Sequence, residues 1–254
     1  MSMSTQTAFV GKKCLVTGAG RGIGRAIVAE LYARGATVYA LSKNPSNLES
    51  LKKDFPNVIP ICVDLSNWEE VKKVVEPLEA LDVLINNAGI NEPCTFLEIT
   101  GESFDRVFNI NLKAVMQISQ IVAKKMIERG EGGSIINMSS MCSVRPLPRA
   151  GIYTCAKAGL DMLTKVMAVD LGPYKIRVNS VNPALVMTDM TAPVRPEPNE
   201  EENEIIYNIL QRIPTGVFFV PVSDVVNTTL FLASDETSQI NGQCLAVDGG
   251  YLAT

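Results

Sequence analysis

The chain has 254 residues, of which 46% are hydrophobic, and its formal net charge is −4 at pH 7. This length accommodates one large α/β domain or two small ones, and the acidic balance disfavours partners that need a basic surface, such as nucleic acid or anionic membranes. The sequence contains no histidine, which excludes Ser-His-Asp and Cys-His catalytic sites and any His-ligated metal, so we expect no metal centre.

A glycine-rich loop follows the first expected strand. Residues Lys13–Thr17 are apolar and β-favouring, which predicts a short buried strand, and a helix is expected over 25–34, ending at Gly35. Glycines between strand and helix allow a tight turn and close approach of the backbone to a pyrophosphate, which the helix N-terminus attracts. A glycine-rich turn without a ligand is the alternative. We expect the dinucleotide contacts of this loop to come from Gly18, Arg21, Gly22, Ile23 and Gly24.

The second expected strand, residues 37–41, ends where the choice of cofactor is made. A fold that binds NAD usually places Asp or Glu about 20 residues after the glycine loop, where it holds the ribose 2′-hydroxyl. This chain has Ser42 and Lys43 there, and no acidic residue before Glu49. A hydroxyl and a cation suit a 2′-phosphate, which Arg21 can also reach. The sequence therefore predicts NADP(H) over NAD(H), with ordinary surface cations as the alternative.

Two further expected strands, residues 58–63 and 81–85, end in polar or small residues. Asp64 follows the first of them, where its carboxylate either bonds the adenine amine or caps the helix around Trp68. Residues 86–89, Asn-Asn-Ala-Gly, follow the second and suit a tight turn beside the nicotinamide ribose, although they also read as an ordinary turn. The cofactor contacts expected at these strand ends are Asp64, Leu65, Asn87, Ala88 and Gly89.

Tyr153 and Lys157 are the candidate proton-transfer pair. Their four-residue spacing places both on one face of a helix, and an ammonium near a phenol favours the phenolate, so we expect Lys157 to lower the pKa of Tyr153. Ser140, at a neighbouring strand end, is expected to hold a substrate oxygen while Tyr153 delivers the proton. Because Tyr-xxx-Lys also occurs by chance on amphipathic helices, an ordinary helix edge is the alternative.

Strand and helix patterns alternate from Lys13 to Leu245 without a linker-like break. This alternation predicts an α/β fold with a single doubly wound Rossmann domain over residues 1–254, a parallel sheet and helices on both faces. The exception is the Pro-containing, acidic stretch 191–204, between a strand over 176–181 and a last helix over Val222–Ala233. We interpret residues 184–212 as a substrate lid.

The chain shows no sign of export or membrane insertion. No apolar run approaches the length of a membrane span, and residues 1–8 are polar and uncharged, unlike a signal peptide. Six cysteines form no CxxC pair, as expected of reduced thiols in a cytoplasmic protein. The helix that carries Tyr153 has more apolar surface than one sheet needs, which indicates burial against another subunit.

Taken in order, the motifs at 17–24, 86–89, Asn111, Ser140 and 153–157 resemble the classical short-chain dehydrogenase/reductase family. By this resemblance, Tyr153 is the general acid that protonates a carbonyl oxygen, and Lys157 lowers its pKa and binds the nicotinamide ribose. Ser140 holds the substrate oxygen, and Asn111 maintains a water-linked proton relay.

The resemblance also implies cofactor contacts after the strand at 176–181. Thr188 falls where the family's Thr bonds the nicotinamide carboxamide, and the backbone of Val186 is expected to do the same. Pro183 is a further expected contact, although Pro183-Ala184 stands where the family often has Pro-Gly.

Segments 96–98, 120–123, 160–168 and 171–179 look like the dicarbonyl/L-xylulose reductases within the family, which use NADPH and are typically homotetramers. These similarities predict an NADPH-dependent carbonyl reductase of small dicarbonyls or ketoses such as L-xylulose, in carbohydrate metabolism. Two positions depart from that group, because Met141 and Ala150 replace Gln and His. A less polar pocket favours less polar carbonyls, so a reductase of bulkier apolar ketones is one alternative and a non-catalytic NADP(H)-binding sensor another. The expected substrate contacts are Ser140, Met141, Leu147, Ala150 and Tyr153.

Overall fold

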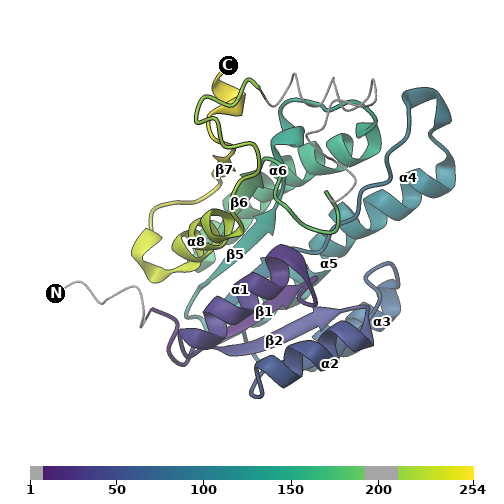
Figure 1. Ribbon diagram of the computed structural model, residues 1–254. Coiled ribbons are helices and arrows are strands. Elements are labelled where there is room, and N and C mark those ends of the chain that lie inside the picture. The colour runs from purple at the N-terminus through teal and green to yellow at the C-terminus, as the bar shows by residue number, and fades with distance from the viewer. Residues whose placement is uncertain (1–7, 192–210) are drawn as a thin grey trace.

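Seven strands pair in parallel in the computed structural model, which describes residues 8–191 and 211–254 (Figure 1). Their order across the sheet is β3-β2-β1-β4-β5-β6-β7, and every adjacent pair is parallel. The strands are β1 (Lys13–Thr17), β2 (Thr37–Ser42), β3 (Ile59–Cys62), β4 (Val83–Asn86), β5 (Gly133–Met138), β6 (Ile176–Pro183) and β7 (Cys244–Val247).

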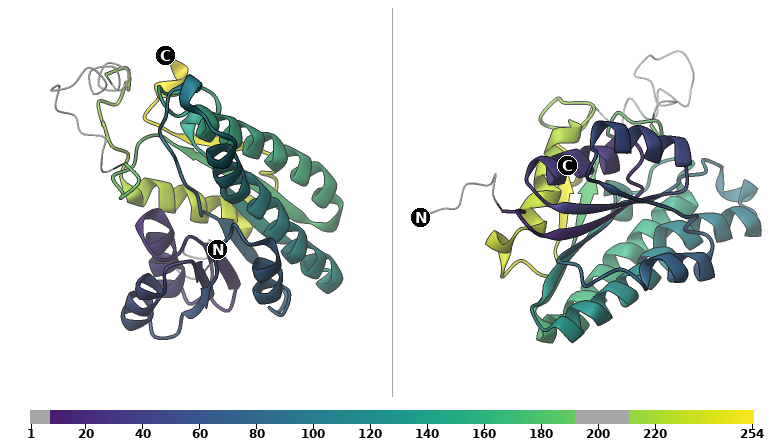
Figure 2. Two further views of the ribbon diagram at one scale, coloured as in Figure 1. Left: turned by 90° about the vertical axis from the view of Figure 1, so that its right-hand side faces the viewer. Right: turned by 90° about the horizontal axis from the view of Figure 1, so that it is seen from below.

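Helices cover both faces of this sheet, as Figure 2 shows. The helices are α1 (Gly22–Ala33), α2 (Pro45–Asp54), α3 (Trp68–Val75), α4 (Gly101–Phe108), α5 (Ala114–Arg129), α6 (Gly151–Leu171) and α8 (Val222–Ala233). Because successive strand residues point to opposite faces, Cys14 and Val16 pack in one core cluster with α1 and α8, whereas Leu15 packs in a second cluster with α3 and α5. A strand buried on both faces is apolar throughout, which explains the continuous apolar runs of the sequence.

The sheet winds in two directions from β1. Strands β2 and β3 extend it to one side and β4 to β7 to the other, so the order reverses between β1 and β4. Ligands of open α/β sheets bind at such a switch point, outside the carboxyl ends of the strands. The fold therefore places any ligand site beyond Thr17 of β1 and Asn86 of β4.

These observations confirm the predicted α/β class, with a doubly wound parallel sheet and helices on both faces. The treatment of residues 1–254 as one domain stays a prediction. The predicted lid at 184–212 falls largely on residues outside the described ranges. Within those ranges, no helix has the length and apolar character needed to cross a membrane.

Asparagine side chains, rather than Asp64, begin the two helices that follow β2 and β3. Asn44 caps α2 by accepting from the Asn47 amide, and Asn67 caps α3 by accepting from the Glu70 amide. Such caps satisfy amide groups that have no partner within the helix. The alternative in which Asp64 caps the helix at Trp68 is therefore wrong.

Candidate active site

The glycine loop leaves no room for side chains at its base. Gly18 and Gly22 adopt positive φ angles of 65° and 54°, which L side chains rarely adopt. A Cβ on Gly24 would lie 2.3 Å from the Gly18 carbonyl oxygen and 2.5 Å from Asn87 Nδ2. The base of the loop is thus packed closely against the turn at Asn87, and the loop leads directly into α1, an arrangement that fits the pyrophosphate of a dinucleotide.

Hydrogen bonds join the ends of β1 and β4 at the switch point. Thr17 Oγ1 accepts from the amides of Asn87 and Ala88, both at 3.0 Å. The Asn87 side chain donates to the carbonyl oxygens of Thr17 (2.9 Å) and Gly18 (3.3 Å). These bonds fix the turn at 87–89 against the glycine loop, so both expected cofactor segments meet in one place.

Arg21 turns away from the other residues expected at the 2′-phosphate. Its guanidinium forms an ion pair with Asp189, at 2.9 Å between Nη1 and Oδ2. On the other side of the loop, a Cβ on Gly20 would lie 2.9 Å from Ser42 Oγ. The structure therefore places Ser42 beside Gly20, whereas Arg21 reaches towards the segment after β6, and the contact of Lys43 with a 2′-phosphate stays a prediction.

Asp64 and Leu65 follow β3 as expected. Asp64 Oδ1 accepts from the amide and hydroxyl of Ser66, at 2.9 and 2.8 Å. Hydrogen bonding from the Ser66 amide lowers the pKa of the Asp64 carboxyl, with smaller help from the Ser66 hydroxyl and Lys43 and against the effect of burial. The carboxylate is exposed, and Leu65 packs against the second core cluster. Their contact with adenine stays a prediction.

The segment after β6 lies against the glycine loop. Pro183 pairs with Val247 at the end of the strand, and Val186 forms an isolated bridge with Val220. A Cβ on Gly22 would lie 3.5 Å from the Thr188 methyl group, which places Thr188 beside the start of α1 and Ile23. The geometry thus brings the two ends of the expected cofactor site together.

Ser140, Tyr153 and Lys157 converge beyond the carboxyl end of β5. Ser140 begins the 3-10 turn η3 (Met141–Ser143) and accepts from the Cys142 amide at 3.1 Å. Lys157, 3% exposed, donates from Nζ to the Met138 carbonyl oxygen at 2.7 Å, and Nζ lies 5.6 Å from the centre of the Tyr153 ring. The predicted helical spacing of the pair is correct, since both residues lie on α6.

Burial is the largest cause of the pKa shifts of Tyr153 and Lys157. Burial raises the pKa of Tyr153, the nearby Cys142 raises it further, and a hydrogen bond with Ser140 opposes the rise. Burial lowers the pKa of Lys157 to about 8, opposed by Asp161 and Cys142. The pKa of Tyr153 is therefore raised rather than lowered in this structure, because desolvation of the phenolate is the largest effect, and a lowering by Lys157 stays a prediction.

Asn111 lies in a π-helical turn, η2 (Asn109–Lys113), between α4 and α5. Its side chain, fully buried, donates to the carbonyl oxygens of Ile90 (2.8 Å) and Val107 (3.0 Å) and accepts from the Ile90 amide (3.1 Å). A Cβ on Gly89 would lie 2.7 Å from Asn111 Oδ1 and 3.5 Å from Lys157 Nζ. Asn111 thus holds the chain after β4 close to Lys157. Single π turns occur frequently at functional sites.

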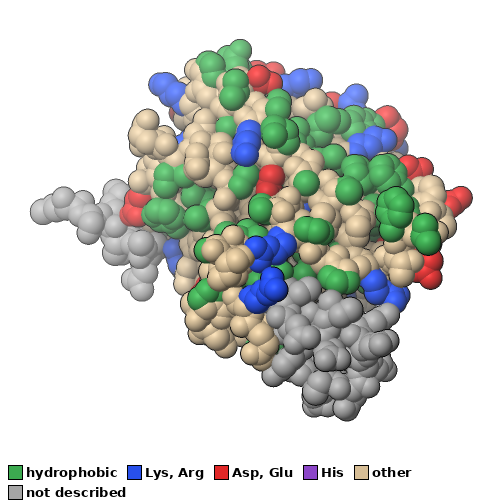
Figure 3. All heavy atoms as spheres, turned by 90° about the horizontal axis from the view of Figure 1, so that it is seen from above, with side chains coloured by type: hydrophobic (Ala, Val, Ile, Leu, Met, Phe, Trp, Pro, Cys, Tyr) green, Lys and Arg blue, Asp and Glu red, His purple; other side chains and the backbone are tan. Residues whose placement is uncertain are grey.

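The expected substrate residues differ in burial. Met141 is 1% exposed and packs in the first core cluster, and Ala150 is 8% exposed, whereas Leu147 is partly buried. Cys94 forms an isolated bridge with Ala150, which places the turn η1 (Phe96–Glu98) beside the start of α6. Figure 3 shows hydrophobic side chains across the face seen from above. Contact of Met141, Leu147 or Ala150 with a substrate stays a prediction.

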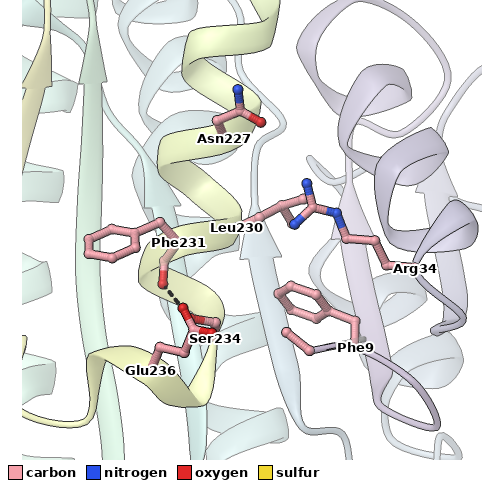
Figure 4. Close-up of a pocket in the computed structure, with 8 residues that line it drawn as sticks. Phe9, Arg34, Asn227, Leu230, Phe231, Ser234 and Glu236 are labelled. Carbon is pink, nitrogen blue, oxygen red and sulfur yellow. Dashed lines mark hydrogen bonds between the residues drawn. The ribbon is translucent and has the colours of Figure 1, made fainter. Parts of the chain in front are cut away.

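Two hollows in the described residues lie at the opposite edge of the sheet. The smaller, about 210 Å³, is lined by Ala8, Phe9, Arg34, Asn227, Leu230, Phe231, Ser234 and Glu236, from the chain before β1 and the ends of α1 and α8 (Figure 4). The larger, about 580 Å³, is lined by charged groups that include Lys12, Arg129 and Arg177. Neither contains Ser140, Tyr153 or Lys157, so both are separate from the candidate site.

Three further groups at this site are not among the residues expected from the sequence. Gly20 excludes any side chain between the loop and Ser42, Thr17 holds β1 and β4 together, and Asp189 pairs with Arg21. Gly20 was visible in the glycine-rich run. The pairing of Asp189 was not, because 168 residues separate it from Arg21.

Comparisons with known proteins agree with this geometry. A model of the short chain dehydrogenase family matches residues 12–199. The chain is 46% identical to L-xylulose reductase of Homo sapiens, over 96% of this chain and 98% of that protein, and 45% identical to carbonyl reductase [NADPH] 2 of Sus scrofa, over 98% and 100%. The solved structure of L-sorbose reductase from Gluconobacter frateurii, complexed with NADPH and L-sorbose, has a TM-score of 0.86 at 28% identity and covers 98% of this chain and 99% of its own. This chain therefore belongs to the short-chain dehydrogenase family of oxidoreductases.

Proposed function

We propose that the chain is an NADPH-dependent carbonyl reductase in which Tyr153 is the general acid. The observation that carries this proposal is the convergence of Ser140, Tyr153 and Lys157 beyond β5, next to the turn at 87–89 that packs on the glycine loop. The names of the relatives that share nearly the whole chain support the same chemistry.

The cofactor residues on this chain are those that line the switch point. The glycine loop would hold the pyrophosphate, Ser42 and Lys43 a 2′-phosphate, and Val186 and Thr188 the carboxamide. When bound, NADPH supplies the hydride. Two relatives with NADPH in their printed names or ligands support this choice over NADH.

The proton-transfer roles follow from the environment of each group. Because burial raises the pKa of Tyr153, its phenol stays protonated at neutral pH and can donate to a carbonyl oxygen. Ser140 holds that oxygen through its hydroxyl. Lys157, with a pKa of about 8, carries a positive charge at pH 7 and stabilises the phenolate left after transfer.

For the substrate we propose small dicarbonyls or ketoses such as L-xylulose, on the names of the relatives. A second candidate, bulkier apolar ketones, is favoured by Met141 and Ala150, which offer no side-chain hydrogen bond to a sugar hydroxyl. A panel of an α-dicarbonyl, L-xylulose and a bulky apolar ketone, assayed with NADPH and NADH in parallel, separates the two. Turnover of the bulky ketone alone would assign the enzyme to apolar ketones instead of small dicarbonyls or ketoses, and the proposed carbonyl reductase activity would still hold.

We also propose a cytoplasmic homotetramer. Met162, Val166 and Val169 of α6 are 59%, 48% and 75% exposed, and their spacing places them on one side of the helix. An apolar helix face of this kind is suited to another subunit.

Replacement of Tyr153 by Phe tests the assigned general acid. We expect Tyr153→Phe to bind NADPH within about twofold of wild type and to lose roughly 10²- to 10⁴-fold in kcat, because only the proton donor is removed. Tyr174→Phe, at the far end of α6 and 49% exposed, is the matched control and should keep full activity. Near-normal turnover in Tyr153→Phe would sink the assignment. No detectable turnover of any substrate by the wild type, with NADPH still bound, would favour the cofactor-binding sensor.

A further inference from the structure

Asp161 lies on α6 one turn beyond Lys157, so Tyr153, Lys157 and Asp161 follow one another at four-residue intervals along one side of the helix. Its carboxylate faces β6. Oδ2 accepts from Asn182 Nδ2 at 2.7 Å, and Oδ1 lies 3.1 Å from the Ser180 hydroxyl. Ser180 and Asn182 are 0% and 2% exposed, whereas Asp161 is partly exposed, so both contacts are part-buried.

The carboxylate fixes the orientation of the Asn182 amide. Asn182 Oδ1 accepts from the Ser180 hydroxyl at 2.8 Å, so its Nδ2 group is turned towards Asp161. A carboxylate only accepts hydrogen bonds, and the opposite orientation would set two oxygens against each other. As an acceptor, the Asp161 side chain therefore selects one orientation of a buried amide.

This amide in turn supports the turn that carries Ser140. Asn182 Nδ2 lies 2.9 Å from Ser143 Oγ and 3.3 Å from the Ser140 carbonyl oxygen. The Ser143 hydroxyl donates to that same carbonyl oxygen at 2.7 Å. A continuous hydrogen-bonded path thus leads from Asp161 through Asn182 to the backbone of Ser140.

Asp161 also acts on Lys157 through space. The titratable neighbours of the Lys157 ammonium are Asp161 and Tyr153 on α6 and Cys142 in η3. Burial raises the pKa of the Cys142 thiol, so Cys142 is neutral at pH 7 and Asp161 is the carboxylate among these groups. A nearby negative charge stabilises the ammonium against the cost of burial.

We infer that Asp161 is a positioning residue of the proposed reductase, which orients Ser140 through Asn182 and keeps Lys157 charged. The inference rests on the proposed function, since it assigns these two roles to the same site. Asp161 itself lies behind the reacting groups, and its effect reaches them through other residues.

Two substitutions separate these effects in a pH profile of kcat/KM for carbonyl reduction. Asp161→Asn keeps a hydrogen-bond acceptor for Asn182 but removes the charge. Activity of the wild type falls as pH rises through the pKa of Lys157, about 8, and in Asp161→Asn we expect this fall roughly one pH unit lower. Asp161→Ala also loses the acceptor, so we expect the same displacement and, at pH 6, a decrease in kcat on the order of tenfold with KM for NADPH unchanged.

Asp170→Asn is the matched control, since Asp170 is exposed on the same helix and should reproduce the wild-type profile. A wild-type profile in both Asp161 variants would overturn the inference. Should Asp161→Ala fail to fold, Asp161→Asn alone decides the question.

Unfolding by urea between pH 7 and 10 gives a readout that does not depend on activity. The folded pKa of Lys157 lies below its ordinary 10.5, so this residue binds more protons in the unfolded chain between about 8 and 10.5, and its contribution to stability rises with pH in that window. Tyr153 and Cys142, whose pKa values are raised in the folded chain, contribute with the opposite sign, so the Lys157 contribution is obtained as a difference from the matching Lys157→Met variant. In this difference, we expect the rise to begin at lower pH in Asp161→Asn than in the wild type. If the wild type is inactive but the rise in stability begins at lower pH in Asp161→Asn, the proposed reductase is rejected and the coupling of Asp161 to Lys157 is kept. If the rise begins at the same pH in both proteins, that coupling is rejected.

Discussion

The ammonium of Lys157 donates to the Met138 carbonyl oxygen at the end of β5 and is almost entirely covered by protein. Its charge is therefore costly, and the pKa near 8 leaves the group poised just above neutrality. The four-residue spacing from Tyr153 was visible in the sequence, but the degree of burial was not. Desolvation depends on which distant segments cover a group, here β5 and the turn at η3, and this decides the direction of both pKa shifts.

The ion pair of Arg21 with Asp189 leads to a prediction about cofactor affinity. Because Asp189 engages its guanidinium, Asp189 competes with a 2′-phosphate and repels it. Both side chains are about two-thirds exposed, so the effect is small. We expect Asp189→Asn to tighten NADPH binding by about two- to fivefold and to leave NADH binding unchanged, as measured by titration calorimetry.

The control for this prediction is the same change in a chain that lacks the guanidinium. In an Arg21→Ala background, Asp189→Asn should have a smaller effect on NADPH binding, since the competition for the guanidinium is gone and only the repulsion of the phosphate by Asp189 remains. Weaker NADPH binding in Asp189→Asn would show instead that the ion pair helps to hold the cofactor.

At the scale of elements, the glycine loop is the most constrained segment of the candidate site. A Cβ on Gly24 meets backbone and the Asn87 side chain well inside contact distance, whereas a Cβ on Gly101, at the start of α4, meets nothing within 4 Å. We expect Gly24→Ala to lower the free energy of unfolding by about 1–3 kcal/mol and to weaken NADPH binding at least tenfold, because the loop must shift.

Gly101→Ala is the matched control and should preserve both properties, as followed by urea unfolding and NADPH titration. If both variants keep the wild-type free energy of unfolding and NADPH affinity, the loop can shift to accept a Cβ at position 24 without loss of stability or binding. That result would also exclude close helix–strand packing as the reason for glycine at position 24.

Elements of regular pattern were predicted well, and irregular ones were not. The strand at Lys13–Thr17 and the helix at Val222–Ala233 have the predicted bounds, because apolar periodicity and turn residues mark them. The π turn around Asn111 has no such signal, since it differs from its flanking helices only in hydrogen-bond register. The sequence offers Asp64 as one candidate for the cap that Asn67 forms, because both residues precede the helix and both can accept from its amides.

At the scale of the molecule, the candidate site is made where chain segments far apart in sequence end at one edge of the sheet. Thr17 ends β1, Asn87, Ser140 and Thr188 follow β4, β5 and β6, and the parallel order places these strand ends side by side. The sequence identified each segment separately, and the alternation of strands and helices predicted that they meet. The sequence does not reveal which side chains from distant segments pair with one another. Arg21 with Asp189 and Asp161 with Asn182 are two such pairs, and only the folded backbone brings them together.

The exposed face of α6 provides the test of assembly. We expect the wild type to sediment at about 110 kDa, four times the chain mass of 27.5 kDa. Val169→Glu should shift the protein to smaller species, because it sets a charge on an apolar face that is 75% exposed in the single chain. Val10→Glu, at 65% exposure near the amino end of β1, is the matched control. A tetramer that withstands Val169→Glu would place the contact on another face, and a 27.5 kDa wild type would leave the α6 face open to solvent.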